Sequence, residues 1–141
     1  MAEFMGVRVH AVDEAVDDFA KLSSAVPVSG SVASGSSRFV LDGKLNANYK
    51  AVNLLLDQGA TVRRVDDSST GLEPGDFIVS GGSGFADVAE ATGVDFRALG
   101  REPSSSIHDH ERMRVGMYQR HRGGNMDEGW TRFLLEQFAF P

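Results

Sequence analysis

The chain has 141 residues, of which 41% are hydrophobic and 24% charged, and these proportions are typical of one globular domain. Its net charge of −6, without any block of basic residues, argues against nucleic acid as the main partner. The chain contains no cysteine, which excludes disulfides, thiolate metal sites and a cysteine nucleophile.

The first 36 residues predict a strand, a short helical turn and a loop. Gly6–Val12 alternates apolar and polar residues, as half-buried strands do. Residues 13–26 place apolar side chains near helical spacing, and residues 27–36 are rich in serine and glycine, which indicates a loop or linker. We therefore divide the chain into a linking segment (1–26), a Ser/Gly-rich loop (27–36) and an α/β domain (37–141).

The next segment predicts a strand, a helix and a second strand. Gly59 stands where a helix ends in the left-handed conformation, which glycine enters without steric cost. The flanking residues 37–42 and 60–66 are typical of strands, so their crossover should be right-handed. Residues 44–58 place apolar side chains along one helical face: Leu45, Tyr49, Val52, Leu55 and Leu56.

The chain then repeats this outline. Residues 67–75 have the composition of a turn, and residues 76–80 predict a short strand with three apolar residues in a row, which indicates that both faces are covered. Residues 81–93 predict a short helix that ends at its final glycine. Residues 94–99 predict another strand.

The final part predicts a polar connection (100–113), a last strand (114–118) and a last helix, Met126–Phe138. Asn125 and Glu128, three residues apart, match a capping box. Strands that alternate with helices indicate a three-layer α/β sandwich with a mainly parallel sheet. The last helix carries a broad apolar stripe that must be covered by something: Trp130, Phe133, Leu134 and Phe138.

The strongest ligand candidate is the basic, glycine-rich loop before the last helix. In open α/β sheets ligands gather at the carboxyl ends of the strands, and helix N-termini favour anions. Because Asp127 and Glu128 already complement the helix dipole, a capped helix with an exposed basic loop is the simpler interpretation. The candidate anion site consists of Arg120, Arg122, Gly124, Asn125 and Met126.

A second candidate is a metal site made by His108, His110 and Glu111. Two imidazoles and a carboxylate suit a divalent metal, but alternate residues share a face only where the backbone is extended. A solvated loop is the simpler interpretation. No catalytic residue stands out elsewhere in the chain.

Residues 118–141 read YQRHRGGNMDEGWTRFLLEQFAFP, and this stretch resembles one in large prokaryotic proteins of the zinc carboxypeptidase (carboxypeptidase-A-like) metallopeptidase family. The family pattern is S-M-D-E-G-W-T-R-W-x-L-E-x-F-x-F-P, and Phe133 replaces its second tryptophan. Weaker matches precede it in the same order, at MGVRV, AVNLLL, GDFIVSG and GVDFRAL. The matching residues are Met126, Asp127, Glu128, Gly129, Trp130, Thr131, Arg132, Leu135, Glu136, Phe138, Phe140 and Pro141.

The resemblance places this chain outside the catalytic part of that family. There an H-x-x-E pair and a distant histidine hold zinc, and a glutamate is the general base. HDHE at His108–Glu111 has that spacing but lacks the surrounding residues. The resemblance instead implies the region downstream of the peptidase domain, with a class I glutamine amidotransferase-like (flavodoxin-like) fold that is truncated at its C-terminal end. Zinc would then belong to the parent's peptidase domain.

Our functional hypothesis is a non-catalytic accessory α/β domain, with a structural, positioning or ligand-binding role. The peptidase domain of the parent, or a second copy of this chain, would be its partner. The alternative is an autonomous small metal-binding protein or hydrolase that uses His108, His110 and Glu111. We expect no membrane partner, because no apolar run could cross a bilayer and no secretory signal is visible. The compartment stays open.

Overall fold

The computed structural model describes residues 13–14, 23–24, 28–104, 106–119, 121–122 and 126–141. The strand expected at Gly6–Val12 lies outside these residues. Within them the elements in chain order are β1 (Arg38–Leu41), α1 (Asn46–Asp57), β2 (Thr61–Val65), β3 (Phe77–Ser80), α2 (Phe85–Thr92), β4 (Arg97–Ala98), β5 (Ile107–Asp109) and α3 (Met126–Gln137).

The strands form one antiparallel sheet in the order β4-β1-β3-β2-β5. The expected mainly parallel sheet is therefore wrong, and so is the flavodoxin-like fold that the resemblance implies. The physical reason lies between β2 and β3. Residues 66–76 hold no helix, and backbone hydrogen bonds close them into a hairpin from Val65 to Gly75 and Asp76. Strands joined in this way run antiparallel, whereas parallel neighbours need a long crossover.

This hairpin inserts β3 between β1 and β2. Strands β1 and β2 still run in the same direction around α1, as the βαβ interpretation requires, but they are not neighbours. Strands β3 and β4 repeat the relation around α2, with β1 between them. The order β4-β1-β3-β2 is the split βαβ arrangement of ferredoxin-like folds, extended at one edge by β5.

Among the described residues, helices cover one face of the sheet only, so this part of the chain has two layers instead of three. Alternate residues of each strand point to opposite faces, and those facing α1 and α2 build the main core with Leu55 and Val88. The opposite face, which we call the open face, holds a smaller cluster in which Leu72 of the β2–β3 loop covers Val40, Val65 and Ile78. A loop therefore covers the second face of β3, where we expected helices.

The predicted helices of this region are confirmed. Helix α1 ends with Gly59 at φ 79°, and the N–H groups of Gly59 and Ala60 donate to Leu56 O and Leu55 O. This is the Schellman pattern that the sequence indicates. Helix α2 also ends at a left-handed glycine, Gly93 with φ 69°, whose N–H donates to Ala89 O in the simpler αL motif.

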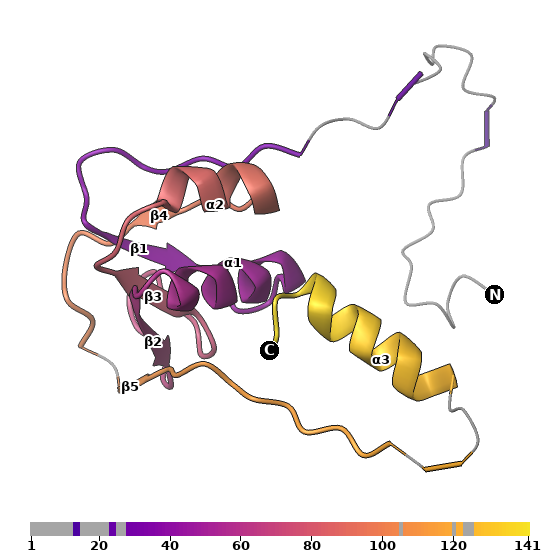
Figure 1. Ribbon diagram of the computed structural model, residues 1–141. Helices are drawn as coiled ribbons and strands as arrows, with labels where there is room; N and C mark the ends of the chain where they lie inside the picture. The colour runs from indigo at the N-terminus through magenta and orange to yellow at the C-terminus, as the bar shows by residue number, and fades with distance from the viewer. Residues whose placement is uncertain (1–12, 15–22, 25–27, 105, 120, 123–125) are drawn as a thin grey trace.

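Two elements near the C-terminus differ from expectation. The polar connection contains β5, which pairs with β2 at the sheet edge. The strand expected at residues 114–118 is absent, because this segment runs extended without pairing to the sheet. Figure 1 shows this segment leading away from the sheet to α3, whose far end returns to α1. We call residues 28–110 the body and residues 111–141 the arm.

Candidate functional site

The anion site predicted before α3 is described only in part. Arg120, Gly124 and Asn125 lie outside the described residues, so neither the site nor the capping box is tested. Arg122 is exposed, and Met126, the first residue of α3, is 79% exposed. The Glu128 carboxylate accepts a hydrogen bond from Arg132 Nη2 at 2.6 Å, one turn further along the helix.

The histidine pair lies on and beside an edge strand, where we expected a loop. His108 is in β5, and its Nδ1 lies 2.7 Å from Asp66 Oδ1. His110 follows β5, and its ring packs against Phe77 with centroids 5.3 Å apart. Burial, with the positive charges of Arg64 and His108, lowers the pKa of His110. Within the described ranges no three acidic, histidine or cysteine side chains form a group suited to a metal ion.

The arm presents an exposed apolar surface along α3. None of the described residues of α3 is buried. One side of the helix, with Leu135, lies beside Val115 and Met117 of the extended segment. The other side faces outward and lines a shallow surface hollow, and its side chains are 49–79% exposed. This outward surface, called the α3 stripe below, consists of Met126, Trp130, Phe133 and Leu134.

The end of the arm is tied to α1 by two polar side chains. Asn53, which is buried in α1, donates its side-chain N–H to Phe138 O at 2.9 Å. Arg112 donates to Ala139 O at 2.8 Å and to Asn53 O at 3.2 Å, and it pairs with Asp57. Hydrogen bonds from these two side chains therefore fix where α3 ends, beside the partly buried residues Phe138 and Phe140.

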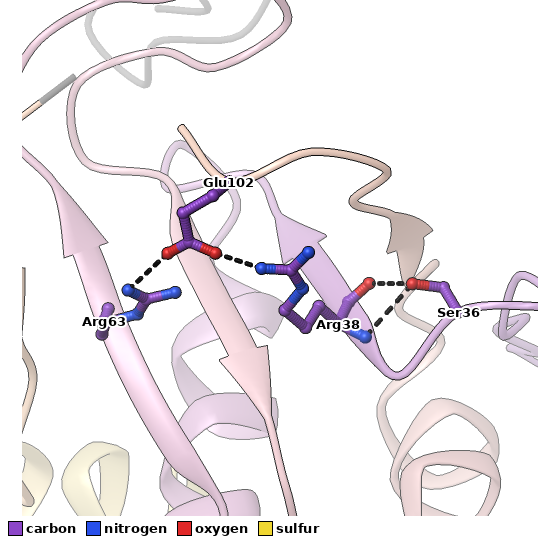
Figure 2. A network of polar contacts seen from close by, with 4 residues as sticks. All are labelled: Ser36, Arg38, Arg63 and Glu102. Atoms are coloured by element: carbon purple, nitrogen blue, oxygen red, sulfur yellow. Dashed lines mark hydrogen bonds and ion pairs between the residues drawn. The ribbon is translucent and has the colours of Figure 1, made fainter. Parts of the chain in front are cut away.

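The open face of the sheet carries a second candidate site. Arg38 of β1 and Arg63 of β2 reach toward each other across β3, and the Glu102 carboxylate lies between them (Figure 2). One Glu102 oxygen accepts from Arg63 Nη1 at 2.7 Å, and the other contacts Arg38 Nη1. The hydrogen bond from Arg63, together with the charges of Arg63 and Arg38, lowers the pKa of Glu102.

Beside these charges lies a hollow of about 570 Å³ between the β2–β3 loop and the β4–β5 connection. Its apolar lining includes Val40, Leu72 and Leu99. Its charged lining consists of Glu102, Arg97 and Arg101. Its volume lies within the range of small-molecule sites.

Sequence reasoning missed this second site completely. A signal existed, since Arg38 begins the apolar strand β1 and Arg63 lies between Val62 and Val65 in β2. Two facts could not be predicted from the sequence. Strand β3 lies between β1 and β2, and the β4–β5 connection brings Glu102 over the sheet.

Comparisons with known proteins found no matching family model, curated protein or solved structure. In the part of the chain that the structure describes, no helix has the length and apolar character needed to span a bilayer.

Proposed function

We propose that this chain is a non-catalytic interaction module that docks through the α3 stripe onto a second copy of itself. The observation that carries the proposal is the lack of any buried residue in the described part of α3, although its outward side is apolar. A separate helix of 12 residues is marginal in water. Its stability normally comes from packing one apolar side against other structure, so the stripe requires a cover.

The size of the stripe suits pairing between two copies. Large side chains cover about 150–250 Å² each, so the four side chains of the stripe, at 49–79% exposure, offer roughly 500 Å². Two copies together bring about 1,000 Å², the smallest area expected of a specific interface. In a two-fold pair each copy supplies the same patch, so one apolar stripe is enough.

Two of the four charges of α3 lie away from this surface. Glu128 and Arg132 pair with each other on the opposite side of the helix from Trp130 and Phe133. Asp127 and Glu136 lie at the two edges of the stripe by helical spacing, where they would form part of the polar rim of an apolar interface.

The test is the molar mass in solution, measured by light scattering after gel filtration from 1 to 300 µM. We expect the wild-type chain to be dimeric in this range and the Trp130→Ser/Phe133→Ser variant to be monomeric. Leu45→Ser is the matched control, because Leu45 is 55% exposed but belongs to the body, and it should leave the dimer intact.

A wild-type chain that stays monomeric at 300 µM would contradict self-pairing. The resemblance then supplies the other occupant, the peptidase domain of a zinc carboxypeptidase-like parent. A chain that is monomeric and also does not bind such a domain would contradict docking as its role.

A further inference from the structure

The side chains of Arg38 and Arg63, which we call the arginine pair, are held more firmly than the Glu102 carboxylate that lies between them. Both arginines extend from strands of the sheet, and their side chains are 34% and 23% exposed. Ser36 fixes the backbone at Arg38 by donating to Arg38 O and accepting from Arg38 N–H. Glu102 is 50% exposed and belongs to a connection without regular structure. Of the three groups, the carboxylate is the one free to exchange.

If the Glu102 carboxylate leaves, another anion must take its place between Arg38 and Arg63. Two guanidinium groups that converge on one point repel each other unless a negative charge lies between them. Each oxygen of Glu102 meets a different arginine, which is the geometry of a carboxylate bridged by two donors. Any molecule that displaces Glu102 must bring an equivalent group.

Glu102 also forms part of the wall of the neighbouring hollow. A movement of its side chain therefore joins that hollow to the two guanidinium groups. The joined space would offer apolar contact at Leu72 and Leu99, and further positive charge at Arg97 and Arg101. In a chain of net charge −6, the joined space brings four arginines together, of which Arg97 already pairs with the buried carboxylate of Asp76 at 3.9 Å.

We propose that Arg38 and Arg63 form a binding site for a small organic acid, and that Glu102 occupies it as an internal ligand that the acid displaces. One carboxylate of the ligand takes the place of the Glu102 carboxylate. Its carbon body lies on Leu72 and Leu99, and a second acidic group faces Arg97 or Arg101. This site is on the open face of the body and is independent of docking through α3.

The experiment is titration calorimetry with citrate on the full chain and on Glu102→Gln, which keeps the size of the side chain and removes its charge. An internal ligand reduces the apparent affinity in proportion to the fraction of time that it leaves the site vacant, so a site that is vacant about a tenth of the time binds about tenfold more weakly. We expect Glu102→Gln to bind citrate at least about tenfold more tightly than the wild type. Adding Arg63→Gln to this variant should abolish the gain.

One control separates displacement from a simple change in net charge. Glu90→Gln removes the same charge from α2, on the helical side of the sheet. It should change citrate affinity by less than about threefold if release of the arginine pair is what matters.

Equal citrate affinity in wild type and Glu102→Gln would overturn the proposal, and so would a gain that survives Arg63→Gln. A gain for inorganic phosphate as large as that for citrate would overturn the assignment to organic acids. Circular dichroism spectra of all variants should match the spectrum of the wild type. If Arg63→Gln is misfolded, Arg63→Lys takes its place in the Glu102→Gln variant, and because it keeps the charge it should retain part of the gain in citrate affinity.

Discussion

The body and the arm place their apolar side chains differently. The body buries a continuous core between the sheet and two helices, with Phe77, Leu41 and Leu55 at 0% exposure. The described residues of the arm include none that is buried, and Tyr118, Met126 and Trp130 are 63–87% exposed. Both regions have amphipathic helices of 12 residues, α1 and α3. The comparison teaches that an apolar stripe predicts that one side of a helix must be buried, but does not say which part of this chain or of a partner buries it.

The same contrast appears where the two helices end. Both α1 and α3 finish with the hydrogen bonds of a Schellman motif, at Ala60 N–H to Leu55 O and at Phe140 N–H to Leu135 O. The left-handed residue is Gly59 in the body, but in the arm it is Ala139, at φ 56°. Alanine is strained in this conformation. The strained residue is also the one whose carbonyl Arg112 holds.

The largest expected difference between the regions comes from removing one phenylalanine from each. Phe77→Ala should lower the free energy of unfolding by about 3–5 kcal/mol, because this fully buried ring contacts Tyr49, Arg64 and His110. Phe133→Ala, in the arm, should change it by less than about 0.5 kcal/mol in the monomer. Urea unfolding followed by circular dichroism measures both, on samples dilute enough for gel filtration to show the monomer. Similar costs at the two positions would contradict the division into body and arm.

A smaller effect is expected at the junction of the two regions. Arg112→Met removes hydrogen bonds to two backbone carbonyls and a partly exposed ion pair, and should cost about 1–2 kcal/mol. It should also make the arm several times more sensitive to limited proteolysis while the body stays intact. Arg114→Met, two residues further along the same segment, is the control. Unchanged cleavage in Arg112→Met would show that the arm is held by other contacts.

The smallest effects should come from exchanging the helix-ending residues. Gly59→Ala should cost about 1 kcal/mol by urea unfolding, through conformation alone, because an added Cβ has no neighbour within 4 Å. Ala139→Gly should stabilise the end of α3 by relieving the strain at this position. It should slow amide hydrogen exchange in α3 about two- to fivefold, which corresponds to about 0.5–1 kcal/mol. Faster exchange in Ala139→Gly would mean that the strain at Ala139 is relieved in some other way.

Local elements were predictable because their signals are local. Helices α1, α2 and α3 follow from apolar spacing and, for the first two, from the glycines that end them. Strands β1, β2 and β3 follow from short apolar segments between turns. The sheet order was mistaken because three buried residues in β3 were interpreted as a strand between two helical layers. A loop residue, Leu72, covers the second face instead.

The candidate sites show the same limit. The apolar stripe of α3 was named from its spacing, and three of the four residues named for it, Trp130, Phe133 and Leu134, are exposed. The pairing of Arg38 and Arg63 around Glu102 could not be predicted, because it joins residues 38, 63 and 102 through strand order and a loop path. The metal and anion sites proposed from the sequence stay predictions.

By itself the sequence determined which segments are helical or extended, since periodicity and turn residues act over a few neighbouring positions. The tertiary structure alone decided that β3 lies between β1 and β2, that one face of the sheet stays open, and that Glu102 reaches the arginine pair. Strand order depends on hydrogen bonds and burial between residues distant in the chain, and such pairings leave no periodic trace in the sequence.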